Sequence, residues 1–98
     1  MKIFANSFYS VKVQFFNEMY DLCDKMDSNY NVVKDLIIKN GWVNEMHTNV
    51  PGPDGRLSYG GACFPKDTQA LYNTMLENGS ICEVLGATIS ERNKMRKN

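Results

Sequence analysis

One apolar stripe constrains this chain more than any other feature. Its members are three or four residues apart, so they share one side of an α-helix. They are Phe4, Phe8, Val11, Phe15, Met19, Leu22 and Met26. The stripe predicts a single helix over roughly residues 2–27 of a 98-residue chain. No capping residue precedes it, and we expect the helix to continue a segment upstream of Met1.

Two shorter helices are predicted from the residues at their ends. Asn31 is a suitable N-cap and Gly41 a suitable terminator, which gives a helix over residues 32–40. Pro65 fits the first turn of a helix because its missing N–H is not needed there, and the following pattern predicts a helix over residues 65–78.

A fourth helix near the C-terminus is predicted from a capping box. Ser80 and Glu83 have the S-x-x-E spacing in which each side chain bonds the other residue's backbone N–H. No stretch has the alternation of a strand. The predicted fold is therefore all-α, with one long N-terminal helix and three shorter helices. Residues 1–98 are expected to form one domain with a modest core.

The segment 41–64 shows no periodicity. It holds five of the seven glycines and two of the three prolines. A connection of this length in a small domain is either functional or disordered. Its apolar residues can anchor it to the helices; these are Trp42, Met46, Leu57, Tyr59 and Phe64. We therefore predict a long, ordered, functional loop.

Composition excludes several classes of protein. The formal net charge is zero, which argues against nucleic-acid binding, and no apolar run approaches a membrane span. Three cysteines without a CxxC motif and a single histidine predict no metal site, and suit a reducing, cytoplasmic compartment. The basic residues near the C-terminus are interpreted as favourable partners of a helix dipole rather than a binding patch. They are Arg92, Lys94, Arg96 and Lys97.

Cys63 is the strongest candidate for covalent chemistry. It lies just before the predicted start of a helix, where free N–H groups and the dipole favour an anion, and Lys66 adds positive charge. A thiolate is a strong nucleophile toward carbonyl carbon. The alternative is an inert small hydrophobe, which is the interpretation given to Cys23 and Cys82 within helical patterns.

Five further residues have both a plain and a functional interpretation. Asp67 can be an ordinary acid in a first helical turn, or it can hold a water near the thiol. Lys2 and Asn6 share one helix face, which is either solvated or directed at one oxygen atom. His47 can bind substrate from the loop, and Arg56 can grip a phosphate or a carboxylate.

Four segments carry a family resemblance: residues 2–7, 16–18, 50–55 and 59–67. Their sequences, KIFANS, FNE, VPGPDG and YGGACFPKD, resemble the UDP-glucose 6-dehydrogenase family, which includes GDP-mannose dehydrogenase. The resemblance covers nearly the whole chain. It implies the central helical domain of such an enzyme, with a fold like the C-terminal domain of 6-phosphogluconate dehydrogenase. An N-terminal NAD-binding and a C-terminal nucleotide-sugar-binding Rossmann domain would flank it.

The resemblance also implies roles for residues. Cys63 matches the nucleophile that attacks the sugar C6 aldehyde in an oxidation of alcohol to carboxylate that consumes two NAD. Lys2 and Asn6 match the pair that stabilises oxygen at C6, and Asp67 matches the acid that positions water. Lys66 matches a position beside the cofactor.

The remaining implications concern substrate and assembly. Tyr59, Gly60 and Gly61 match the segment that packs along the UDP-sugar, and the family dimerises largely through the long helix. His47 stands where many members have an arginine that contacts the neighbouring subunit's site, which leaves that contact in doubt.

The cofactor half of the enzyme is not recognisable in this chain. It has no GxGxxG fingerprint and no βαβ pattern, so NAD would be bound mainly by another domain or subunit, and we expect the chain alone to be inactive. A non-catalytic dimerisation module, a remnant of such an enzyme, is the alternative. A free thiol redox protein is disfavoured because no resolving cysteine lies near Cys63 in sequence.

Overall fold

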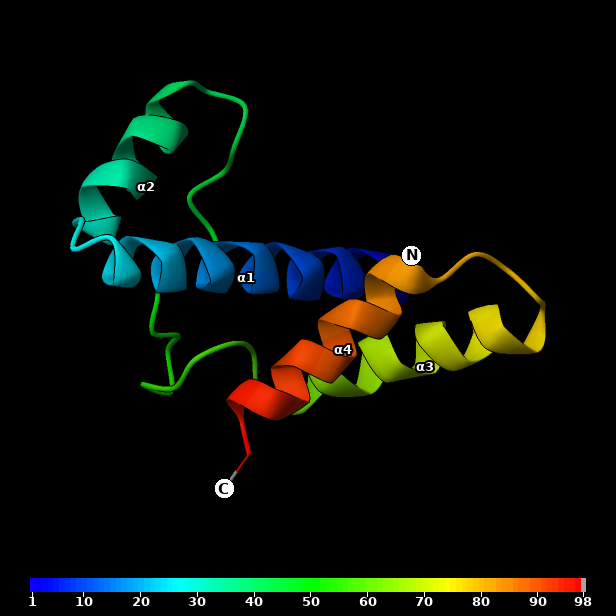
Figure 1. The fold of residues 1–98 in the computed structure, drawn as a ribbon. Helices are drawn as coiled ribbons and strands as arrows, with labels where there is room; N and C mark the ends of the chain where they lie inside the picture. Colours follow the sequence, from blue (N-terminus) through cyan, green and yellow to red (C-terminus); the bar gives the residue numbers. More distant parts are fainter. Residues whose placement is uncertain (98) are drawn as a thin grey trace.

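Four helices make up the regular structure of the chain. The computed structural model describes residues 1–97, and no strand occurs among them. The helices are α1 (Lys2–Lys25), α2 (Tyr30–Lys39), α3 (Cys63–Glu77) and α4 (Glu83–Met95). The all-α prediction, with one long helix followed by three shorter ones, is confirmed (Figure 1).

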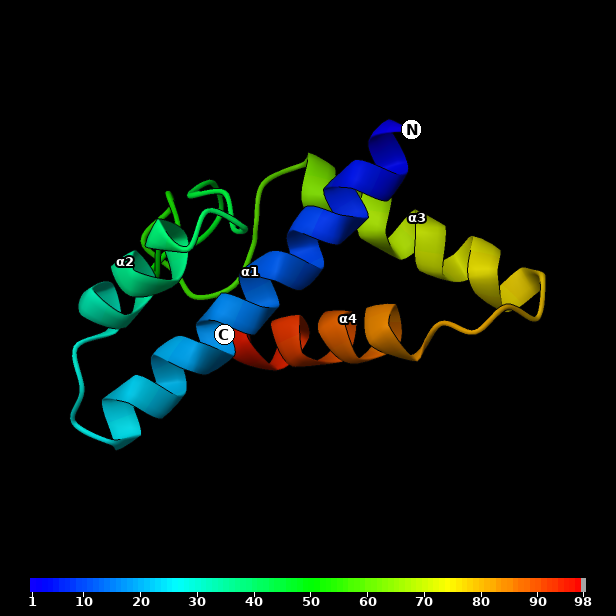
Figure 2. The same ribbon diagram turned by 90° about the horizontal axis from the view of Figure 1, so that it is seen from above.

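Helix α1 is the axis of the fold. The other three helices all pack against it. Figure 2 shows α3 and α4 together on one side of α1, with α2 and the long loop on the other. The start of α3 lies beside the N-terminal half of α1, so the loop delivers residues 60–63 to this helix pair.

Most of the apolar stripe of α1 does not face the core, although Met19 packs against it. Its exposed members keep more than half of their surface accessible: Phe4 (57%), Phe8 (61%), Phe15 (57%), Leu22 (58%) and Met26 (65%). The face that packs inward is largely polar and includes Ser7, Ser10, Gln14 and Asn17, all buried. The pattern therefore predicted the helix but not the face that it buries.

Hydrogen bonds within and between helices make this polar face compatible with burial. Ser10 Oγ donates to the Asn6 carbonyl oxygen at 3.1 Å and shares a 2.7 Å bond with Thr68 Oγ1 of α3. Both residues are fully buried, and small side chains at such a crossing let two helices approach closely. The hydroxyl groups of Ser10 and Thr68 are hydrogen-bonded, so their burial does not carry the cost of leaving a polar group without a partner.

The apolar core is small and lies between α1 and α2. Phe16, Cys23 and Tyr30 are its buried residues, with neighbours such as Met19 and Val33 packed against them. The Tyr30 hydroxyl donates to the Thr48 carbonyl oxygen at 2.5 Å, and burial raises the Tyr30 pKa to about 12. This bond fixes the first part of the long loop to α2.

The predicted ends of α1 and α2 need correction. Helix α1 ends at Lys25 rather than near residue 27, because Asp27 adopts a positive φ of 59°. Helix α2 begins at Tyr30, and its N-cap is Asn29, not Asn31. The Asn29 side chain accepts from the backbone N–H of Asn31 at 2.9 Å, so the predicted cap lies inside the helix. Gly41 has φ +89°, as expected of a helix terminator.

Two helix starts also differ from the prediction. Helix α3 begins at Cys63, so Pro65 lies at its third residue and the thiol belongs to the first turn. The Ser80–Glu83 capping box is wrong: the N-cap of α4 is Cys82, which makes no side-chain cap bond. Ser80 is instead tied to the end of α3 by its N–H, which donates to the Met75 carbonyl oxygen at 2.9 Å.

Some predicted anchors of the loop are not buried. Tyr59 is only 5% exposed, whereas Trp42 is 90% exposed and Met46 is 64% exposed.

No helix in the described part of the chain has the length and hydropathy that a bilayer-spanning segment needs.

Candidate active site

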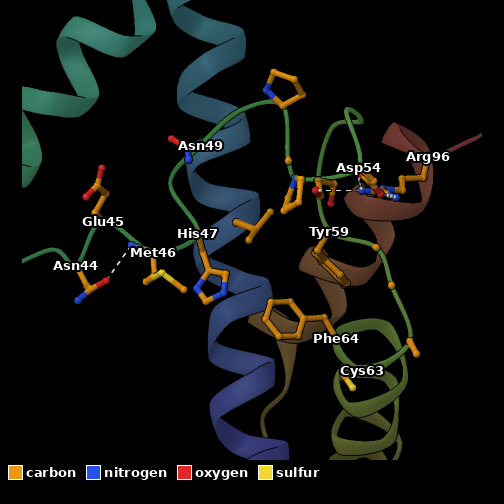
Figure 3. A pocket seen from close by; sticks show the side chains of 18 residues that line it. Asn44, Glu45, Met46, His47, Asn49, Asp54, Tyr59, Cys63, Phe64 and Arg96 are labelled. Atoms are coloured by element: carbon orange, nitrogen blue, oxygen red, sulfur yellow. Dashed lines mark hydrogen bonds and ion pairs between the residues drawn. The ribbon is translucent and has the colours of Figure 1, made fainter.

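A cavity of about 1060 Å³ opens beside the start of α3. The long loop, the first residues of α3, α1 and the end of α4 form its walls (Figure 3). Five of the predicted site residues line it: His47, Tyr59, Gly60, Gly61 and Cys63. The other five, Lys2, Asn6, Arg56, Lys66 and Asp67, are not among its lining residues.

Cys63 is exposed at the first position of α3, in the cavity wall. The chain reaches it through Gly61, whose φ of +83° is a conformation that glycine adopts without strain. The N-cap Ala62 provides no side-chain acceptor, so the N–H groups of the first turn are left for an anion. The position can therefore receive a negatively charged oxygen atom of a ligand.

Asn6 and Asp67 are joined directly, although they lie 61 residues apart in sequence. Asn6 Nδ2 donates to Asp67 Oδ2 at 2.8 Å. Asp67 lies one helical turn after Cys63 on α3, and Lys2 lies one turn before Asn6 on α1. The structure thus brings the predicted amide and carboxylate together. Lys2 itself is exposed in the first turn of α1.

His47 and Phe64 in the cavity wall belong to an aromatic cluster with Tyr9 of α1. The ring of His47 stacks on Tyr9, with centroids 4.7 Å apart, and lies 5.3 Å from the ring of Phe64. Burial lowers the pKa of His47, and the nearby positive charge of Lys12 lowers it further. His47 Nδ1 is buried without a hydrogen-bond partner. This environment favours the neutral imidazole.

The remaining predicted residues have different surroundings. Lys66 is exposed on the first turn of α3, where it can meet a ligand from outside the chain. Arg56 lies on an exposed part of the loop, and its guanidinium donates to the Arg96 carbonyl oxygen at 3.4 Å. Tyr59 is buried under the Arg92 guanidinium, which lies 5.5 Å from its ring centroid, and burial raises the Tyr59 pKa.

Sequence reasoning missed the residues that hold the loop in place. Gln14 and Asn17 of α1 bond Ser58, and Arg92 and Arg96 bond the same stretch from the other side. The two arginines are four residues apart and so share one helix face, which was the available indication. Their assignment to the helix dipole alone was incomplete.

No cluster of three or more His, Cys, Asp or Glu side chains suited to a metal ion occurs among residues 1–97.

Comparison with known proteins identifies related sequences. A family model described as the UDP-glucose/GDP-mannose dehydrogenase family, central domain, matches residues 1–94. The chain is 40% identical to UDP-glucose 6-dehydrogenase of Rickettsia prowazekii (strain Madrid E), over 98% of this chain and 21% of that protein. It is 31% identical to UDP-glucose 6-dehydrogenase of Rhizobium meliloti (strain 1021), over 99% of this chain and 21% of that protein. The chain thus spans about a fifth of the length of these relatives.

Proposed function

The chain belongs to the UDP-glucose/GDP-mannose dehydrogenase family, as its central domain, and from this premise we propose that it supplies the nucleophile of a nucleotide-sugar 6-dehydrogenase. The reaction is the NAD-dependent oxidation of the C6 alcohol of a UDP-sugar, with UDP-glucose as the first candidate, to the carboxylate. One observation carries the proposal. Cys63 lies in a cavity wall at an uncapped helix N-terminus, one turn from an Asp67 that is bonded to Asn6.

The covalent step belongs to Cys63. After the first oxidation, its thiolate adds to the C6 aldehyde and forms a thiohemiacetal. Loss of a hydride from C6 and of the proton from its hydroxyl then gives a thioester. Water cleaves the C–S bond and releases the carboxylate, the thiol and a proton. NAD, when bound, accepts the hydride in both oxidations.

The residues of this chain fit a contact at the periphery of NAD and not a complete NAD-binding site. The described chain is all-helical, whereas a dinucleotide site is built on a βαβ unit with a glycine-rich turn. Lys66, exposed beside Cys63, is the residue that we assign to this contact. NAD-binding and nucleotide-sugar-binding domains, on the same protein or on a separate subunit, would supply the rest.

Lys2, Asn6 and Asp67 act on the oxygen atoms of the reaction. Lys2 and Asn6 are donors one turn apart that stabilise negative charge on the C6 oxygen as the thiolate adds. Asp67 accepts a proton from the water that attacks the thioester. The 2.8 Å bond from Asn6 holds this carboxylate in place, which supports the assignment.

The cavity is the proposed place of the sugar nucleotide. Tyr59, Gly60 and Gly61 line its wall, and the two glycines present only backbone there, which lets a ligand approach closely. His47 provides an apolar face, and we assign to Arg56, which is not among the cavity lining, a contact with a phosphate of the ligand. The neutral imidazole of His47 makes it a packing contact rather than a charged one.

The exposed stripe of α1 is the proposed homodimer interface. Large apolar side chains that remain accessible along a helix of 24 residues indicate a surface that a partner covers. The alternative function is a dimerisation module that catalyses no reaction, and the same stripe favours it.

We place the enzyme in the cytoplasm, where its three free cysteines stay reduced.

A chimaera tests the proposal. The matching segment of the Rickettsia prowazekii enzyme is replaced by this chain, and formation of UDP-glucuronate and NADH is measured. The Cys63→Ser variant should lose at least about a thousandfold in acid formation, because a hydroxyl at this site is a far weaker nucleophile. Cys82→Ser is the matched control and should retain activity, since its thiol lies outside the cavity lining. Acid formation that survives Cys63→Ser would refute the nucleophile, and a dimeric but inactive chimaera would favour the alternative.

A further inference from the structure

The loop stretch 57–60 is held between two helices just before it reaches Cys63. On the α1 side, Asn17 Oδ1 accepts from the Ser58 N–H at 2.8 Å, and the Ser58 hydroxyl donates to Gln14 Oε1. Ser58 is 3% exposed, and its contacts come from the buried polar face of α1. One edge of the stretch is therefore fixed by α1.

Two arginines hold the other edge: Arg92 in the last turn of α4 and Arg96, its C-cap. Arg92 Nε donates to the Tyr59 carbonyl oxygen at 3.1 Å. Arg96 Nε donates to the Leu57 carbonyl oxygen at 2.8 Å, and Arg96 Nη2 donates to the Ser58 carbonyl oxygen at 3.2 Å. Three successive carbonyl groups thus accept from guanidinium groups one helical turn apart.

Arg96 also forms the one two-pronged ion pair of residues 1–97. Its Nη1 lies 2.7 Å from Asp54 Oδ2 and its Nη2 lies 3.2 Å from Asp54 Oδ1. The Arg96 side chain is 8% exposed, against 43% for Asp54. The hydrogen bond from Arg96 is the main cause that holds the Asp54 pKa below its usual 3.8, so the pair persists at neutral pH.

Gly60 leaves the space that Arg96 occupies. A Cβ on Gly60 would lie 2.3 Å from Arg96 Nη1 and 2.9 Å from Asp54 Oδ2, closer than atoms can approach. By contrast, a Cβ on Gly61 would meet no atom within 4 Å, and the requirement there is the positive φ. Gly60 is therefore required because a side chain would clash with its neighbours. Gly61 is required because its backbone has a positive φ.

We propose that Arg96, supported by Arg92, is a positioning residue that fixes the stretch 57–60 and thereby the cavity wall and the approach to Cys63. Arg96 lies beyond residues 1–94, which the family model matches, and it lines the cavity. Its guanidinium meets two carbonyl groups and a carboxylate at once, which a lysine ammonium cannot reproduce in this geometry. The role in turnover rests on the function proposed above, whereas the role in holding the loop does not.

Amide hydrogen exchange of the 98-residue chain tests the positioning without substrate or cofactor. Arg96→Gln and Arg96→Lys should each raise exchange at residues 58–62 by about tenfold or more, with α1 and α3 changed by less than about twofold. Lys94→Gln, which removes an exposed cation from the same helix end, is the control and should change neither. Arg96 variants that match Lys94→Gln would overturn the inference, as would Arg96→Lys that matches the wild type.

Two readouts separate positioning from a general structural role. The amide shifts of Gly60 and Gly61 should titrate with Asp54 below about pH 3.8 in the wild type but not in Asp54→Asn; shifts that titrate equally in both would count against the clamp. Gly60→Ala should loosen the stretch, yet add little in an Arg96→Ala background, because the tightest contact is with Arg96 and the half-exposed Asp54 side chain can move once its partner is removed. If Gly60→Ala raised amide exchange by the same factor in the wild-type and the Arg96→Ala backgrounds, the contact between Gly60 and Arg96 would be contradicted.

The active chimaera provides the functional arm. Arg96→Gln and Arg96→Lys should lower kcat by about tenfold, while Lys94→Gln should not, because a loosened wall misplaces the reacting carbon. An unaltered kcat in both Arg96 variants would overturn the positioning role. A chimaera that is inactive with the wild-type segment would instead count against the proposed function, and the exchange result would still decide whether Arg96 holds the loop.

Discussion

The two faces of α1 invert the usual order of burial. The inward face buries Ser7, Ser10, Gln14 and Asn17, whereas the outward face exposes Phe4, Phe8, Phe15, Leu22 and Met26. In most small domains the apolar side of a helix packs inward. Here the inward side makes specific hydrogen bonds to the loop and α3, and the apolar side stays exposed, where we propose that a second copy of the chain binds. One helix thus combines the contacts that hold the candidate site with an exposed apolar surface.

The contrast explains why so small an apolar core suffices for this arrangement. Only a few hydrophobic residues of the described chain are fully covered, and the contacts that fix α3 and the loop are polar. Polar contacts are directional, so they specify one geometry, which a site needs more than it needs burial. Association through the outer face would add the burial that the monomer lacks.

The largest effect is expected from breaking the inward face. Ser10→Leu places a bulky side chain at a fully buried helix crossing and removes the bond to Thr68, so the free energy of unfolding should fall by about 3 kcal/mol. Urea denaturation measures it. Ser90→Leu, at an exposed position of α4, is the matched control and should change stability by less than about 0.5 kcal/mol. Equal effects of the two substitutions would show that the crossing is not closely packed.

Association should be sensitive to the outward face in the same way. Phe15→Glu introduces a charge into the stripe and should weaken the dimer by about a hundredfold, measured by sedimentation velocity. Gln69→Glu introduces the same charge on an exposed part of α3 and should leave the dimer intact. If the wild type is monomeric at about 50 μM, or if Phe15→Glu remains dimeric, the stripe is not the interface.

A smaller effect is expected from Glu18, an exposed residue of α1. The pKa of Glu18 is raised by its hydrogen bond to Glu91 and by the like charge of that carboxylate. A raised native pKa contributes stability that is present below the usual value of 4.5 and lost as pH rises through the native pKa. Glu18→Gln should therefore flatten this loss and make the chain slightly more stable at pH 7, by less than about 1 kcal/mol because Glu18 is exposed. Thermal unfolding at pH 4 and pH 7 measures it, and a Glu18→Gln variant less stable at pH 7 would contradict it.

The sequence predicted what depends on local pattern. The spacing of Phe4, Phe8 and Phe15 was enough for α1, and the glycine at position 41 was enough for the end of α2, because helix periodicity and positive φ are local properties. The Cys63 motif likewise predicted a helix start, two residues later than the observed one. Helix ends shifted where two polar residues compete for one cap, as Asn29 and Asn31 do.

Tertiary contacts account for what the sequence did not predict. A hydrophobic stripe does not reveal whether its own chain or a partner covers it, so the orientation of α1 could not be predicted from Phe8 or Phe15. The Asn6–Asp67 bond and the Arg96–Asp54 pair join residues far apart in the chain, and neither follows from spacing. Gly60 was expected to let a ligand approach closely. Only the position of Arg96 in the structure shows that a side chain at Gly60 would also clash with this arginine.

The most direct test of the central claim is to trap the covalent intermediate. In the chimaera, Asp67→Asn should slow thioester hydrolysis, so that a sugar-nucleotide adduct accumulates after incubation with UDP-glucose and NAD. Peptide mass spectrometry should place the adduct on Cys63, with Cys23 and Cys82 unmodified. An Asp67→Asn enzyme that forms product with no adduct on Cys63, or an adduct on either other cysteine, would contradict the account.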